Sequence, residues 1–276
     1  MDLGTPNLRF ERRVPIGWCT VDNPAQRNAL SMAMYRGLGR AIRGVAGDPR
    51  LEALVITGVG DVFIVGGDPA AHGPGDAPPA EEDLPFPALH GGEVPVVAAI
   101  NGHCQASGLW LAVLADVAVV SERARFRLPE LRLGVAAPWS SALLPPVIGL
   151  ARAKELALTS RPFGAAEAHA MGLVARVVPH DDLHDEAERA AYELLEAGPA
   201  ARAAWKRAAH AHLPPVDERA VTASIGTAEA REGFAAFAER RPPSWSRVPG
   251  RGEDRRSNGR VGDRLDGGAD GRRTPA

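Results

Sequence analysis

Short apolar runs alternate with helical patterns along the first half of the chain. The apolar runs of strand length cover residues 17–21, 51–57, 94–100 and 116–120. Ser31 lies where an N-cap belongs, before apolar residues at helical spacing, and a further helix is predicted from residues 106–108 to Leu114. Runs that are apolar on both faces are typical of parallel strands covered by helices. The pattern therefore predicts an α/β fold with mostly parallel strand pairing.

The second half of the chain has a mostly helical pattern. Its predicted helices cover residues 150–158, 165–170, 181–197, 200–211 and 221–238, with a short strand within 172–178. Residues 69–87 are dense in Pro, Gly, Ala and acidic residues, so we expect a mobile surface loop there. We expect an α/β core over residues 1–195 and a helical region over 196–245. Residues 246–276 contain almost no large apolar side chains and are expected to form a disordered tail.

Composition and charge exclude several classes of protein. The chain is 45% hydrophobic and 24% charged with a net charge of −2, so nothing draws it generally to nucleic acid or anionic membranes. No apolar run approaches a membrane-spanning length, and residues 1–14 lack the apolar segment of a signal peptide. Cys19 and Cys104 form no disulfide framework and lack metal-ligand spacing. We expect a cytoplasmic protein without a metal site, a nucleic-acid partner or a membrane partner.

Two loop-to-helix junctions have features of an anion-binding site. The first, residues 63–68, contains Gly66 and Gly67 after a strand and a turn, where backbone N–H groups can approach a ligand closely. The second, residues 101–108, leads from a strand into a helix, whose unpaired first N–H groups favour an oxyanion. Either junction alone is also explained by turn geometry.

Five motifs follow one another along the chain. They are NPAQRNAL at 23–30, VITG with F and GGD at 55–68, PVVAAING at 95–102, PE with LG at 129–134, and GLV at 172–174. In this order they resemble the crotonase (enoyl-CoA hydratase/isomerase) superfamily, over about residues 14–211. The resemblance implies a crotonase-like core of repeated ββα units (the ClpP/crotonase spiral), a helical C-terminal trimerisation region, and a homotrimer or hexamer. It also implies acyl-CoA substrates, with coenzyme A as part of the substrate and no separate cofactor.

The resemblance also assigns roles to individual residues. It implies that the backbone N–H groups of Gly67 and Ser107 polarise the thioester carbonyl and hold the enolate, while Glu130 transfers protons. The residues that it places around coenzyme A and the acyl group are Arg27 near the phosphates, Val65, Gly66 and Asp68 in the adenine-binding loop, and Trp110 and Trp139 at the pocket.

Three departures from the family pattern bear on the reaction. Trp110 stands where hydratases have the first of two glutamates, so Glu130 is the remaining carboxylate. Ala106 and Ser107 interrupt the usual glycine pattern, and Pro138 replaces the nucleophilic aspartate of dehalogenase members. A single glutamate, its pKa raised by apolar surroundings, suits isomerase-like proton transfer or a decarboxylation that relies on the oxyanion hole. Hydration in an altered site and a catalytically degenerate accessory subunit are the alternatives.

Simpler interpretations of the same residues stay open. Glu130 lies between Arg127 and Arg132 in the sequence, as an exposed and salt-bridged glutamate would. Trp110 on a helix face is equally consistent with core packing. Asp116 follows an apolar helix and is expected to cap or pair with a neighbour rather than react.

Overall fold

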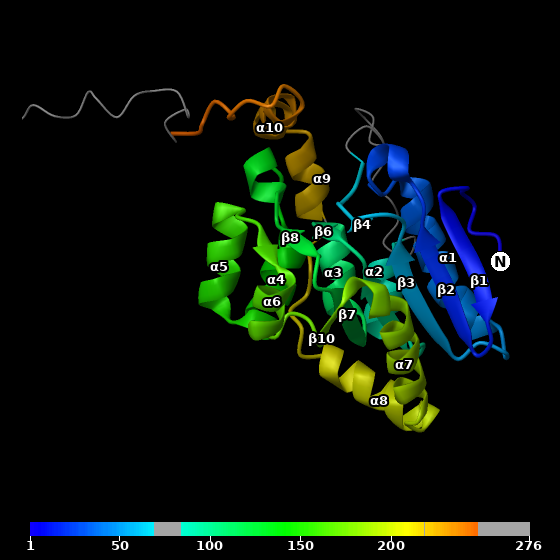
Figure 1. Ribbon diagram of the computed structural model, residues 1–276. Helices are drawn as coiled ribbons and strands as arrows, with labels where there is room; N and C mark the ends of the chain where they lie inside the picture. Colours follow the sequence, from blue (N-terminus) through cyan, green and yellow to red (C-terminus); the bar gives the residue numbers. More distant parts are fainter. Residues whose placement is uncertain (69–83, 218, 248–276) are drawn as a thin grey trace, which may run out of the picture.

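Successive strand pairs divide between two β-sheets (Figure 1). The computed structural model describes residues 1–68, 84–217 and 219–247. The six-stranded sheet contains, in order, β1 (Leu8–Arg13), β2 (Ile16–Val21), β3 (Ala53–Gly58), β5 (Val96–Ile100), β7 (Val117–Ser121) and β10 (Arg176–Val178). The four-stranded sheet contains β4 (Val62–Ile64), β6 (His103–Gln105), β8 (Arg125–Arg127) and β9 (Phe163–Gly164). Within the described residues, β1–β2 and β8–β9 pair antiparallel and the other neighbouring strands of the two sheets pair parallel, which confirms the predicted α/β pairing.

Helices follow these strand pairs and complete the repeated units. The helices are α1 (Met32–Gly47), α2 (Pro85–Gly91), α3 (Ser107–Leu114), α4 (Pro138–Ile148), α5 (Leu150–Thr159), α6 (Ala165–Ala170), α7 (Leu183–Leu195), α8 (Pro199–His210), α9 (Arg219–Ile225) and α10 (Ala228–Ala238). Short 3-10 turns cover Pro24–Gln26, Glu130–Leu133 and His180–Asp182. The pairs β3/β4, β5/β6 and β7/β8 each give one strand to each sheet, which is the repeated ββα architecture that the family resemblance implies.

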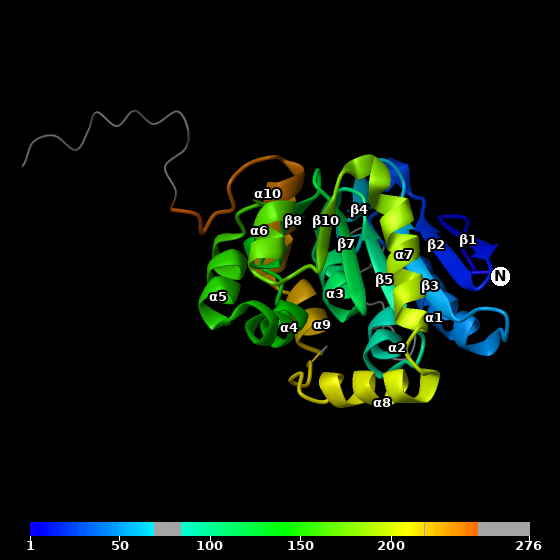
Figure 2. The same cartoon turned by 60° about the horizontal axis from the view of Figure 1, so that its bottom comes forward.

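Both faces of the six-stranded sheet are buried, which explains its continuous apolar strands. Leu54 and Ile56 of β3 face the main core beneath α1 and α3, while Ala53 and Val55 face a second core. The second core lies under α7, which runs along this face of the sheet (Figure 2) and packs three alanines and Leu183 against it. Alternate residues of a strand point to opposite faces, so two covered faces require apolar residues at every position.

The starts of two helices follow local capping rules. Ser31 caps α1, since its hydroxyl accepts a hydrogen bond from the amide of Met34 at 3.3 Å, as predicted. The single helix predicted over 221–238 is wrong. One helix ends before Gly226 and a second begins after it. The Thr227 hydroxyl accepts a hydrogen bond from the amide of Ala230 at 3.1 Å and so caps the start of α10.

The expected loop over 69–87 is partly wrong. Residues 85–87 already belong to α2. Proline is compatible with the first position of this helix, because the amide at that position has no intrahelical acceptor to lose. Residues 69–83, like most of the predicted tail (248–276), lie outside the described residues. No helix in the described part of the chain is long and apolar enough to cross a membrane. The domain boundaries and the C-terminal trimerisation region stay predictions.

Candidate active site

A short backbone ladder holds the first glycine junction in place. The amide of Leu30 donates to the Gly66 carbonyl at 2.8 Å, and the amide of Asp68 donates to the Leu30 carbonyl at 2.9 Å. Gly66 has φ +111°, which a residue with a side chain rarely adopts. The ladder uses the residues on either side of Gly67, whose own amide donates to no other described residue. This N–H is therefore available to a ligand.

The second junction ends in a strained residue. Ala106 has φ +48° and ψ −120°, a conformation unusual for alanine, immediately before the first residue of α3. Ser107 is 1% exposed, and as the first residue of a helix its N–H has no intrahelical acceptor. Gly108 lets α3 approach β4, because a Cβ there would lie 2.5 Å from the carbonyl oxygen of Ile64.

The asparagines of two sequence motifs hold the turn that precedes the first junction. Asn28 is buried, and its Nδ2 donates to the Val62 carbonyl at 2.7 Å. Asn101 Nδ2 donates to the same oxygen at 3.2 Å and to the Gly60 carbonyl at 2.8 Å. Gly102 is required beside them, since a Cβ would lie 1.8 Å from the Asp61 carbonyl oxygen. These residues of the NAL and ING motifs therefore fix the backbone of the turn around Gly60 and Val62.

Glu130 is a buried carboxylate without a charged partner. It begins the 3-10 turn Glu130–Leu133, is 7% exposed, and neither of its carboxylate oxygens has a hydrogen-bond partner among the described residues. Desolvation raises the pKa of Glu130 to about 7. The interpretation as an exposed, salt-bridged glutamate is therefore wrong. Arg127, its neighbour in the sequence, instead donates through Nε to the Ser160 carbonyl at 2.9 Å.

The C-terminal helices cover the turn that carries Glu130. A Cβ on Gly233 of α10 would lie 2.3 Å from the Leu133 carbonyl oxygen, so the helix touches the turn directly. The amide of Ala136 donates to the Ser224 hydroxyl of α9 at 2.9 Å. Residues about a hundred positions further along the chain thus exclude water from this turn.

An aromatic cluster, defined as Tyr35, Phe86, Trp110 and Trp139, lies beside the two junctions. Phe86 packs against Trp110 at 5.7 Å and against Trp139 at 4.8 Å between ring centroids, and the two indoles stack at 6.2 Å. Trp110 and Trp139 are 9% and 7% exposed, and Trp110 Nε1 has no partner within the described structure. Trp110 lies one turn after Ser107 on α3, so the cluster adjoins the second junction.

Tyr35 is a site residue that the sequence analysis missed. Its hydroxyl oxygen lies 3.2 Å from the position of a Cβ on Gly67. Burial raises the pKa of the Tyr35 phenol to about 12, with a further increase from the charge of Glu130. The Ser107 hydroxyl, which has no other hydrogen-bond partner among the described residues, lies close enough to the phenol to lower that pKa. Tyr35 and Phe86 belong to no recognisable motif. For Tyr35, the available sequence signal was a polar aromatic residue on the apolar face of an amphipathic helix.

The residues expected around coenzyme A lie nearer the surface. Arg27 is exposed in a left-handed conformation after the turn Pro24–Gln26, and Val65 and Asp68 are partly buried. Arg27 lies shortly before Leu30, which is hydrogen-bonded to Gly66 and Asp68. Arg27, Val65 and Asp68 therefore lie on the two loops that meet at the first junction. Their contact with coenzyme A stays a prediction. No group of His, Cys and acidic side chains in the described residues could hold a metal ion.

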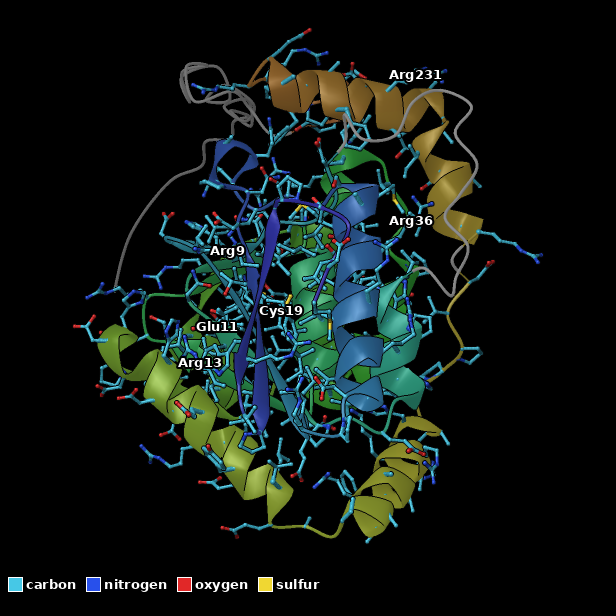
Figure 3. All side chains as sticks on the ribbon, turned by 90° about the vertical axis from the view of Figure 1, so that its right-hand side faces the viewer. Arg9, Glu11, Arg13, Cys19, Arg36 and Arg231 are labelled. Carbon is cyan, nitrogen blue, oxygen red and sulfur yellow. The ribbon has the colours of Figure 1, made fainter. Side chains whose placement is uncertain are left out.

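A groove in the described part of the chain opens on the other side of the turn that Asn101 holds. It has a volume of about 810 Å³ and lies between the β1–β2 hairpin, the carboxyl end of β3 and the start of α7. Figure 3 shows Arg9, Glu11 and Arg13 on the side of β1 away from α1. Arg13 pairs with Glu11 at 2.6 Å and Arg9 with Asp22 at 3.0 Å. Because these charges satisfy one another, we assign the chemistry to the junctions and Glu130 rather than to the groove.

The repeated ββα fold and the meeting of two glycine-rich junctions near a buried glutamate define the crotonase class of acyl-CoA enzymes. Comparison with known proteins agrees with this class. The family model for enoyl-CoA hydratase/isomerase matches residues 11–248, and the chain belongs to this family.

Individual relatives align along nearly their whole length. Carnitinyl-CoA dehydratases of Salmonella agona and Salmonella enteritidis are 34% and 33% identical over 256 residues, 87% of this chain and 98% of each relative. The structure of an enoyl-CoA hydratase/isomerase from Pseudoalteromonas atlantica superposes with a TM-score of 0.78 at 27% identity, covering 87% of this chain and all of the other. That of a carnitinyl-CoA hydratase from Mycobacterium avium gives 0.76 at 29%, covering 88% and 99%.

Proposed function

We propose that this enzyme transfers a proton between two carbons of an acyl-CoA thioester, with Glu130 as its single acid–base residue. The observation that carries the proposal is the burial of Glu130 without a partner, which raises its pKa to about 7. A carboxyl group with a pKa near neutrality serves as both a base and an acid at the same site. Trp110, where a second carboxylate would be needed to hold a water molecule, supports an isomerase over a hydratase.

Glu130 and two backbone N–H groups account for every proton and electron pair that moves in the proposed reaction. The Glu130 carboxylate removes a proton from the α carbon of a 3-enoyl-CoA, and the electron pair moves onto the thioester oxygen to form a dienolate. The N–H groups of Gly67 and Ser107 stabilise the charge on that oxygen. The carboxylic acid then returns the proton to the γ carbon, and the double bond moves to the 2 position. Trp110, Trp139 and Phe86 exclude water from the intermediate.

Dehydration is the second candidate, because the curated relatives named above are carnitinyl-CoA dehydratases. Here Glu130 removes the α proton of a 3-hydroxyacyl-CoA and the hydroxyl leaves as water after protonation. A single carboxyl group would then serve both steps in turn. Decarboxylation and an accessory role without turnover are the remaining alternatives.

Isotope exchange distinguishes these reactions. The enzyme is incubated in D₂O with 3-enoyl-, 2-enoyl- and 3-hydroxyacyl-CoA, and mass spectrometry follows deuterium at the α and γ carbons together with loss or gain of water. Movement of the double bond with exchange supports the isomerase, while loss of water from the 3-hydroxyacyl-CoA supports the dehydratase. Glu130→Gln should abolish exchange and retain acyl-CoA binding, whereas the exposed control Glu122→Gln should behave as wild type. Unchanged exchange in Glu130→Gln contradicts the proposal.

We also propose a homotrimer or hexamer. Trp205 on α8 is 74% exposed and Phe237 on α10 is 69% exposed, so both helices present large apolar side chains that a subunit contact would cover. Light scattering coupled to gel filtration measures the oligomer, and a monomer at micromolar concentration contradicts this assembly.

A further inference from the structure

Tyr35 is held by the same backbone that holds the first junction. Its amide donates to the Ser31 carbonyl at 3.0 Å in the first turn of α1, and Ser31 caps that helix. The preceding residue, Leu30, forms the two ladder hydrogen bonds on either side of Gly67. The phenol and the Gly67 amide are therefore fixed relative to one another by five residues of rigid chain.

The phenol faces the point where the two junctions meet. Its oxygen lies 3.2 Å, and its ring carbon Cε2 3.7 Å, from the position of a Cβ on Gly67. The Ser107 hydroxyl and the Glu130 carboxyl both act on its ionisation. The Phe86 ring, 6.2 Å away between centroids in an edge-to-face arrangement, fixes the ring plane from the other side. A buried hydroxyl among the two amide donors and the base is surrounded by the groups of the proposed reaction.

We propose that the Tyr35 hydroxyl donates a third hydrogen bond to the thioester oxygen as it becomes an enolate. This assignment rests on the proposed function. Tyr35 keeps its proton throughout, so no bond in the phenol breaks and the proton transferred is the one that Glu130 carries. A tyrosine hydroxyl serves the same purpose in the oxyanion hole of ketosteroid isomerase. The unpartnered Ser107 hydroxyl can donate to the Tyr35 oxygen and so strengthen its O–H as a donor.

A purely structural role for Tyr35 makes different demands. If the ring only packs against Phe86, removing the hydroxyl leaves both catalysis and enolate binding unchanged. Tyr35→Phe removes the oxygen and retains the ring. The chain contains two tyrosines, and Tyr192, 46% exposed on α7, provides the matched control Tyr192→Phe.

Two measurements test the proposal. The first is the rate of α-proton exchange, for which we expect Tyr35→Phe to lower kcat by about 100-fold while KM changes little, because the hydrogen bond strengthens as charge develops on the oxygen. The second is binding of acetoacetyl-CoA, whose enolate is detected by its ultraviolet absorbance. We expect the bound probe to ionise at a lower pH than the free probe in the wild-type protein and in Tyr192→Phe. In Tyr35→Phe we expect the preference of the site for the enolate over the neutral probe to fall about tenfold.

The outcomes separate the two proposals. One outcome is that the wild-type enzyme exchanges the α proton and a folded Tyr35→Phe variant matches it in both rate and probe ionisation. This outcome overturns the role of Tyr35 and leaves the proposed function standing. Stabilisation of the bound enolate without proton exchange on any acyl-CoA overturns the proposed reaction, and its loss in Tyr35→Phe still supports the donor. A wild-type protein that binds no acetoacetyl-CoA overturns both. If Tyr35→Phe fails to fold, Tyr35→Met, which also lacks a donor, replaces it with the same probe. A bound probe that ionises at the same pH as in the wild-type protein then overturns the donor role.

Discussion

Gly66 and Ala106 lie against one another, so that a Cβ on Gly66 would be 3.0 Å from the Cβ of Ala106. These two residues immediately precede Gly67 and Ser107. The contact exists because β4 and β6 are parallel neighbours, with Ile64 paired to Cys104, and parallel strands end at the same edge of a sheet. Two junctions about forty residues apart in the sequence are thereby brought to one site.

The strain at Ala106 yields a stability prediction. Ala106→Gly should stabilise the protein by about 1 kcal/mol, because glycine adopts φ +48° without the clash that alanine carries, offset in part by greater freedom of the unfolded chain. Urea unfolding measures the change. Ala112→Gly within α3 is the control and should destabilise by about 1 kcal/mol. A loss of stability in Ala106→Gly would contradict the strained conformation.

The buried carboxyl group predicts a pH dependence of catalysis. In the proposed reaction Glu130 must be ionised to remove a proton, and its pKa is raised to about 7. The rate of α-proton exchange should therefore rise with pH, with a midpoint near 7, and level off above it. Rates in buffers from about pH 4 to pH 9 give the profile, and a midpoint near 4.5, the ordinary value for a glutamate, would show that Glu130 is solvated.

The same group predicts how stability depends on pH. Because the pKa of Glu130 is higher in the folded than in the unfolded chain, its contribution to stability is lost as pH rises from about 4.5 to about 7. Glu130→Gln should therefore be more stable than wild type by up to about 3 kcal/mol at pH 8, and nearly equal to it at pH 4. Urea unfolding at both values tests the difference, and a destabilised variant at pH 8 contradicts the burial cost.

A buried ion pair attaches α8 to the six-stranded sheet. Lys206 Nζ lies 2.8 Å from Asp116 Oδ2 and 3.0 Å from the Val94 carbonyl, and the same Asp116 oxygen accepts from the Val96 amide at 2.7 Å. This confirms that Asp116 pairs with a neighbour.

Lys206→Met should destabilise the protein by about 3–5 kcal/mol, because it leaves the partly buried Asp116 carboxylate without its cation. Lys154 is the other lysine of the chain and is exposed on α5, so Lys154→Met is the matched control and should change stability by less than about 0.5 kcal/mol. Chemical unfolding measures both, and equal effects would contradict the role of the pair.

Phe86 contacts the three other rings of the aromatic cluster and is 2% exposed. Phe86→Ala should destabilise by about 3–5 kcal/mol and enlarge the space beside Trp110 and Trp139, whereas Phe86→Leu should cost much less. We expect the ratio of kcat/KM for long to short acyl-CoA substrates to rise in Phe86→Ala. A ratio equal to that of wild type would place the acyl group elsewhere.

The elements that local rules govern could be predicted from the sequence. The β3 and β5 strands were predicted because both faces are apolar, and the Ser31 cap because a hydroxyl satisfies a free amide in any context. The errors at α2 and at Gly226 arose where proline and glycine have two uses. Proline both begins a helix and marks a loop, and glycine within a helical pattern is tolerated or ends it.

The sequence by itself determined the strands and helices, because glycine turns and apolar periodicity are local properties. The resemblance of its five motifs to a family pattern indicated the family, the repeated ββα units and the candidate positions Gly67, Ser107 and Glu130. The tertiary structure decided the surroundings of these residues. Glu130 owes its raised pKa to the water excluded by its packing, and α10, a hundred residues further on, covers its turn. Tyr35 reaches Gly67 through a ladder between two loops. The solvation of Glu130 and the distance from Tyr35 to Gly67 depend on every element that packs around the site, and these elements come together only in the folded chain.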